Sequence, residues 1–139
     1  MIIAKSKREN YCTEISNENA VVFSDVTPEK GGSGAYLRPH DLLCSGFASC
    51  LNITTRMILD RKNIKYDEVL VKVDLDRSDE NRTKFIYDVD IVADISPEMK
   101  QTIMKLLKNC PVRKTLSKEL EFIAADDFSR CNRKMASFR

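Results

Sequence analysis

The segment RPHDLLCSGFASCLNITTR, residues 38–56, decides the fold of this chain. From Leu42 to Thr55 it carries no formal charge, although 32% of all residues are charged, and it contains the one histidine and two of the five cysteines. Pro39 can open a helix and Asp41 is favourable near the positive end of the helix dipole, so the segment predicts a helix from Pro39 to about Asn63. Its first half is apolar or small on all sides and therefore needs cover on all sides.

The cover for this helix is expected to come in part from a second copy of the chain. A chain of 139 residues has the size of one domain and cannot easily wrap a long helix completely. We therefore expect a homodimer. Small residues along the helix would permit close approach of two backbones, and they are Ser45, Gly46, Ala48 and Ser49. Packing of the helix on the chain's own sheet would explain these residues nearly as well.

The residues before the helix favour strands and then a loop. Residues 2–15 and 20–26 are rich in β-branched and aromatic residues and are separated by the polar SNEN, which predicts a hairpin. Residues 27–37, TPEKGGSGAYL, contain one proline and three glycines. We expect this segment to be a loop, and it is the best candidate in the chain for a mobile lid.

The residues after the helix predict an antiparallel pair of strands and two further helices. Apolar residues alternate with polar ones in 69–77 and 83–94. Ser96 and Pro97 are typical of a helix start, and an apolar stripe follows, formed by Met99, Ile103, Leu106 and Leu107. Residues 112–120 favour a short helix and 121–128 a closing strand. This order predicts a single α+β domain over residues 1–139, with the long helix against an antiparallel sheet.

Composition and charge exclude several classes of function. The 23 basic and 21 acidic residues are balanced and spread along the chain, so no nucleic-acid partner is expected. The uncharged run is shorter than the ~20 residues of a membrane span. The start MIIAKSKREN would place charges inside the core of a signal peptide. We therefore expect a cytoplasmic protein with no membrane partner. The sequence has no CxxC and a single imidazole, so no metal site is expected.

Two cysteines have sequence surroundings that bear on reactivity. Cys110 directly precedes Pro111 at a predicted helix start, with Arg113 and Lys114 close by, and these features lower the pKa of a thiol. The alternative for Cys110 is a small apolar residue at a helix junction. Cys50 lies in the middle of the uncharged helix and is by default a core cysteine. Cys44 is six residues earlier and points about 120° away, so it forms no pair with Cys50.

The run RPHDLLCSGFASCLNITTRMILDRKNI, followed after two alternating strands by NCPVRKTLS, resembles the OsmC/Ohr family of organic hydroperoxide reductases and stress-induced relatives. The resemblance spans roughly residues 20–126. It implies an α+β fold made by two intertwined chains, in which each long helix is buried between sheets and the active sites lie at the dimer interface.

The resemblance also implies a chemistry for the two cysteines. In the family, the cysteine that matches Cys50 attacks a peroxide and becomes a sulfenic acid, and the cysteine that matches Cys110 captures it as a disulfide. A small dithiol or a lipoylated protein then reduces the disulfide, so no cofactor is required. An apolar pocket favours organic hydroperoxides over hydrogen peroxide, and Leu43 and Phe47 are expected to line it.

The residues that activate the thiolate differ from the family pattern. Family members carry a glutamate ten positions before the attacking cysteine and an arginine from an N-terminal loop. Here the glutamate position is occupied by His40, with Asp41 as the adjacent carboxylate, and Arg8 and Arg38 are the candidate arginines. As an imidazolium, His40 would stabilise a thiolate. A solvated residue in the first helical turn is the alternative for His40.

Two further functions remain open at this level. The chain could be a non-catalytic protein that holds a small ligand or fatty chain in its apolar pocket. It could also be a redox-sensing protein, for which the basic tail, residues 129–139, is the one supporting feature.

Overall fold

The structure, a computed structural model, describes residues 1–124. It contains, in chain order, β1 (Ile3–Ser6), β2 (Thr13–Ser16), β3 (Val21–Ser24), the 3-10 turn η1 (Pro28–Lys30), α1 (Pro39–Arg61), β4 (Glu68–Asp76), β5 (Lys84–Val92), α2 (Pro97–Leu106), the 3-10 turn η2 (Leu107–Asn109) and α3 (Pro111–Leu116). The predicted α+β class and the long helix are confirmed. The basic tail and Cys131 lie outside the described residues.

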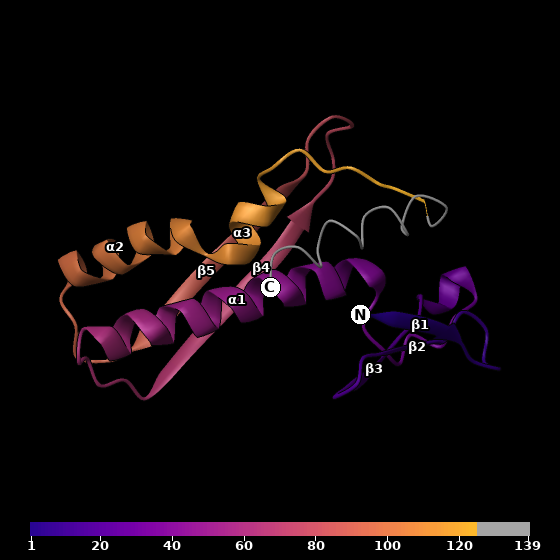
Figure 1. Cartoon of the computed structure of the whole chain (residues 1–139), viewed down its shortest axis with the longest axis horizontal. Coiled ribbons are helices and arrows are strands. Elements are labelled where there is room, and N and C mark those ends of the chain that lie inside the picture. The colour runs from indigo at the N-terminus through magenta and orange to yellow at the C-terminus, as the bar shows by residue number, and fades with distance from the viewer. Residues whose placement is uncertain (125–139) are drawn as a thin grey trace, which may run out of the picture.

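Helix α1 packs on one face of the antiparallel hairpin β4–β5 (Figure 1). The register pairs Val71 with Val89 and Val73 with Tyr87, so the apolar residues of both strands point to the same face. The alternation predicted for the two strands is confirmed, because Val69, Val89 and Ile91 are buried and the residues between them are exposed.

The segment from α2 to α3 completes the core beside α1. Ser96 caps α2 by accepting a hydrogen bond from the Met99 amide at 3.2 Å, as the sequence predicted. Ile103 and Leu107 are fully buried with Leu51 of α1, whereas Leu106 is 38% exposed. Leu106 is thus a member of the predicted apolar stripe that the core of the single chain leaves exposed, and it lines a surface groove.

The N-terminal residues form a separate sheet with the order β1-β2-β3. The prediction of two strands here was wrong, because the first stretch forms two strands by itself and the sheet has three. Residues 7–12 turn the chain between β1 and β2. Tyr11 has a φ of 60° in this turn, and Lys7 N donates a hydrogen bond to Cys12 O. Figure 1 shows this sheet beyond the N-terminal end of α1, away from β4 and β5. Its Ile3, Val21 and Val22 are exposed within the single chain.

The loop between β3 and α1 is organised around a buried carboxylate. Asp25 is 2% exposed and accepts hydrogen bonds from Ser33 Oγ and from the amides of Ala35 and Tyr36. A Cβ at Gly32 would lie 2.2 Å from the Val26 carbonyl oxygen, so this turn requires glycine. The predicted loop is confirmed and its polar contacts organise it, while its action as a mobile lid stays a prediction.

One face of α1 is left uncovered by its own chain. Phe47, Leu51 and Leu59 are buried, whereas Leu43, Ile53 and Met57 are about half exposed. By length and composition, α1 is also apolar enough to cross a membrane, a test that core helices pass as well. The contacts of α1 with β4 and β5 identify it as a core helix. The predicted burial of α1 on all sides is not reached within one chain.

Candidate active site

The two cysteines singled out by the sequence lie side by side. Cys50 is half-buried near the middle of α1, and Cys110 is fully buried at the junction of η2 and α3. The Cys110 thiol donates a hydrogen bond to Cys50 Sγ at 2.9 Å, and both thiols are free. A disulfide has an S–S bond of about 2.05 Å, so only a small movement would join the two sulfur atoms.

Burial dominates the electrostatics of Cys110. Desolvation, followed by the hydrogen bond to Cys50, raises the pKa of the Cys110 thiol above its ordinary value. The amides of Arg113 and Val112 act in the opposite direction but do not outweigh these two effects. The expectation of a lowered pKa at this helix start is thus wrong, because the sequence shows the nearby cations but not the depth of burial.

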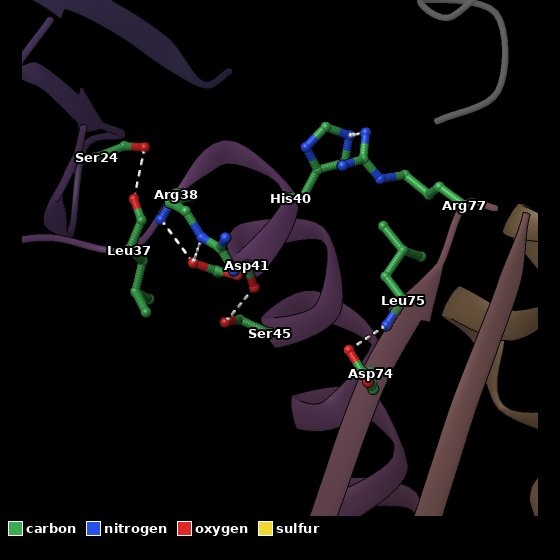
Figure 2. Close-up of polar contacts among 9 residues, drawn as sticks. All are labelled: Ser24, Leu37, Arg38, His40, Asp41, Ser45, Asp74, Leu75 and Arg77. Carbon is green, nitrogen blue, oxygen red and sulfur yellow. Dashed lines mark hydrogen bonds and ion pairs between the residues drawn. The ribbon is translucent and has the colours of Figure 1, made fainter. Parts of the chain in front are cut away.

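The candidate activating residues at the start of α1 contact one another or Arg77, the residue directly after β4 (Figure 2). Asp41 accepts hydrogen bonds from Arg38 N and Nε at 2.9 Å and from Arg38 Nη2 at 2.8 Å, so this pair caps the helix. His40 Nε2 lies 3.2 Å from Arg77 Nη1. Since a guanidinium can only donate, Arg77 is the donor where this contact is a hydrogen bond.

None of these residues reaches Cys50 within one chain. His40 precedes Cys50 by ten residues, which corresponds to about 15 Å along the helix axis. Arg8 is exposed in the turn between β1 and β2, which belongs to the separate N-terminal sheet. The sequence did not single out Arg77 as a neighbour of His40. The one feature that could have indicated it is its position at the end of the predicted strand 69–77.

Phe47 lines a groove of about 210 Å³, together with Phe85, Tyr87, Thr83, Arg113, Leu116 and Ser117. The Phe47 ring packs edge-on against Phe85 and Tyr87, with ring centroids 5.6 and 5.5 Å apart. Phe47 is three residues before Cys50, so it lies one turn away on the same side of α1. Leu43, the other predicted pocket residue, is 52% exposed and is not part of this groove.

A third thiol has a different environment. Cys44 is half-buried, and burial, followed by the charges of Asp41 and Asp74, raises its pKa. Cys44 is therefore kept protonated and unreactive at neutral pH. Within residues 1–124, no three Cys, His, Asp or Glu side chains gather in a way that could hold a metal ion.

Comparison with known proteins gives one family and several similar folds. The family model described as OsmC-like protein matches residues 31–124. No match was found among curated proteins. The fold is similar to that of an OsmC-like protein from Mycoplasma pneumoniae, with 20% identity, 84% of this chain and 85% of that chain covered, and a TM-score of 0.72.

Two further structures carry names that state a role. An organic hydroperoxide resistance protein OsmC from Legionella pneumophila is 22% identical, with 84% of this chain and 89% of that chain covered and a TM-score of 0.57. An organic hydroperoxide resistance protein from Elizabethkingia anophelis is 17% identical, with 87% and 91% covered and a TM-score of 0.61. At these identities the structures establish the α+β fold alone.

Proposed function

The chain belongs to the OsmC-like protein family, and from this premise we propose that it is a cysteine-based peroxidase that reduces organic hydroperoxides through Cys50 and Cys110. The observation that carries the proposal is the 2.9 Å approach of the two Sγ atoms, one on α1 and one at the start of α3. The names of two structural neighbours, both organic hydroperoxide resistance proteins, agree with this substrate class.

The proposed reaction begins at Cys50. Its thiolate attacks the terminal peroxide oxygen, the O–O bond breaks, and the alkoxide leaves and takes up a proton to become an alcohol. Cys50 is then a sulfenic acid. The Cys110 sulfur attacks the Cys50 sulfur, an S–S bond forms, and the hydroxyl group leaves as water with the Cys110 proton. Two thiols and one hydroperoxide thus give one disulfide, one alcohol and one water.

The hydrogen bond between the thiols supports this division of roles. Burial, followed by the contact with Cys50, raises the pKa of Cys110 and keeps its proton in place, whereas Cys50 is the less buried of the two thiols. A retained proton on Cys110 stabilises a thiolate at Cys50 and is available for the leaving hydroxyl group. The disulfide would be returned to two thiols by a small dithiol or a lipoylated protein, which needs no bound cofactor.

We also propose that the active protein is an intertwined homodimer. Gly46 is costly in the interior of α1, and a Cβ there would meet nothing within 4 Å, so the chain's own packing does not require glycine. Close approach of a second copy of the chain to α1 would require glycine at this position. The exposed apolar residues of the N-terminal sheet and of α1 need the same cover.

The dimer bears on how Cys50 is activated. Because about 15 Å of helix separates His40 from Cys50 in one chain, any action of His40, Asp41, Arg38 or Arg8 on the thiolate must come from the second copy. The groove lined by Phe47, Phe85 and Tyr87 is the proposed entry for the apolar part of a hydroperoxide. The cytoplasm, with its thiol reductants, is the proposed location.

Titration with cumene hydroperoxide and mass analysis tests the peroxidase. The wild type should lose two free thiols per chain and two hydrogen atoms of mass for each peroxide consumed. Cys110→Ser should instead gain oxygen atoms at Cys50, and Cys50→Ser should be inert. Cys44→Ser is the matched control and should behave as the wild type. Turnover that survives in Cys50→Ser would end the proposal.

The same titration separates a second candidate, a non-catalytic protein that holds an apolar ligand. That function would leave the thiol count constant under peroxide, with a retained ligand visible in a native mass spectrum. The exposed apolar surface beside the cysteines is the observation that favours it.

A further inference from the structure

The two helices that present the cysteines also contribute to one common groove. Phe47 lies three residues before Cys50 on α1, and Arg113 lies three residues after Cys110 on α3. Both Phe47 and Arg113 line the groove of about 210 Å³. Three residues of a helix correspond to about 4.5 Å along its axis, so this groove has a lining residue about one turn away from each cysteine.

The backbone of Arg113 faces the sulfur pair. The Arg113 amide is one of two amides that lower the pKa of the Cys110 thiol by hydrogen bonding, although burial raises that pKa overall. Cys110 Sγ in turn lies 2.9 Å from Cys50 Sγ. The chain itself therefore holds Arg113 beside both thiols, and no second copy is needed for this placement.

The charge of Arg113 is unpaired in the part of the chain that the structure describes. Within residues 1–124, Arg113 forms no ion pair with a carboxylate. Arg113 is half-buried, and the groove that it lines also contains the rings of Phe47, Phe85 and Tyr87. A cation that is partly removed from water interacts more strongly with a negative charge than a fully solvated cation does. The groove is therefore suited to a ligand with an apolar part and a negative charge that develops beside the guanidinium.

The arginines expected from the sequence to activate Cys50 do not have this position within one chain. Arg38 is paired with Asp41 at the start of α1. Arg8 lies in the turn between β1 and β2, in the separate N-terminal sheet. Arg113 was not among the expected residues, because its relation to Cys50 depends on how α3 packs beside α1.

We propose that Arg113 is a catalytic residue that stabilises the negative charge on the leaving oxygen when Cys50 attacks a hydroperoxide. This inference rests on the proposed function and adds the group that acts on the leaving oxygen. As the sulfur bonds to the terminal oxygen, the electron pair of the O–O bond moves to the oxygen that carries the organic group, which becomes an alkoxide. The guanidinium donates hydrogen bonds to this alkoxide and keeps its own protons, and solvent water supplies the proton that completes the alcohol.

Two peroxides with different leaving groups test this role of Arg113. Tert-butyl hydroperoxide releases an alkoxide, whereas peracetic acid releases acetate, a much weaker base that needs little stabilisation. In single-turnover oxidation followed by mass analysis, Arg113→Gln should react about a hundredfold more slowly with tert-butyl hydroperoxide and only a few-fold more slowly with peracetic acid. Arg113→Lys keeps the charge without the planar pair of donors and should recover part of the loss. Lys118→Gln removes an exposed cation near the end of α3, outside the groove, and should keep both wild-type rates.

The ratio of the two rates is measured within each variant, so it does not depend on how much of that variant is folded. Equal slowing of both reactions in Arg113→Gln would show that Arg113 only packs against the aromatic rings. Unchanged rates would show that it has no part in the reaction. Either result overturns the inference and leaves the peroxidase intact. A wild type whose Cys50 reacts with neither peroxide ends the proposed function, and this inference with it.

Discussion

Cys110 Sγ lies 2.9 Å from Cys50 Sγ, although the two residues are 60 positions apart in the chain. The approach is fixed by the core on both sides, because Leu51 follows Cys50, Leu107 precedes Cys110 by one turn, and both leucines are fully buried. The Cys110 amide also donates to the Leu107 carbonyl at 3.0 Å. The sulfur pair is therefore a property of the packed interior rather than of surface loops.

The first prediction concerns the protonation of Cys110. Because burial and the hydrogen bond to Cys50 raise its pKa, Cys110 should remain a thiol at neutral pH, and its alkylation by iodoacetamide should rise only above the pH range of an ordinary cysteine. The rate of Cys110 alkylation, measured by mass spectrometry at a series of pH values, gives the pH at which half of the Cys110 thiol is ionised. In Cys50→Ala the hydrogen-bonding cause is removed, so the midpoint should move to lower pH. A midpoint below that of a free cysteine would contradict the assignment of Cys110 as the proton donor.

A second prediction uses Gly46 to test the dimer. The chain has room for a side chain at Gly46, and leucine is a better helix former by about 0.8 kcal/mol, so Gly46→Leu should leave the single chain folded. It should nevertheless prevent close approach of a second copy and give a monomer in sedimentation velocity. Leu70→Ala, on the outer face of β4, is the control and should keep the wild-type mass. A dimeric Gly46→Leu protein would assign the interface to another face.

The core beneath the site gives a third prediction. Leu51 is fully buried between α1 and the hairpin, so Leu51→Ala should lower the free energy of unfolding by about 3 kcal/mol through lost burial and a cavity. Urea unfolding at one fixed protein concentration measures it. Ile86→Ala, at a side chain that is 55% exposed on β5, should cost less than about 1 kcal/mol. Equal losses in both variants would show that Leu51 is not in the core.

A fourth prediction concerns the loop that leads into α1. The hydrogen bond from Ser33, helped by backbone amides, holds the pKa of Asp25 below its ordinary value. The ionised carboxylate thus stabilises the folded chain at neutral pH, and this contribution is lost as pH falls from ~3.9, the ordinary pKa of an aspartate, through the lower folded-state value. Asp25→Asn should be less stable than the wild type at neutral pH, with the difference shrinking over that acid range. A difference that stayed constant over that acid range would show that ionisation of Asp25 does not stabilise the fold.

The elements that sequence predicted well are those set by local periodicity and capping. The helix begins at Pro39 as predicted and ends at Arg61, two residues before the predicted stop. Ser96 and Pro97 start α2, and the inward residues of β4 and β5 are those of the alternating pattern. Each of these features depends on residues within a few positions of one another.

Features that depend on tertiary packing were outside the reach of sequence. The raised pKa of Cys110 follows from burial by distant elements, and the exposure of Leu106 follows from how the segment from α2 to η2 packs. The contact between His40 and Arg77 joins residues 37 positions apart. The proximity of Cys50 and Cys110 was expected through family resemblance alone, since no local pattern relates them.

The closeness of the two sulfur atoms also bears on signalling. Since the pair needs to approach by only roughly 1 Å to become a disulfide, oxidation can proceed with helices α1 and α3 almost stationary. The outer surface of the protein would then be the same in the dithiol and the disulfide forms, so another macromolecule could not distinguish the two forms by binding. Such a protein is suited to remove an oxidant and poorly suited to signal the presence of that oxidant to another macromolecule.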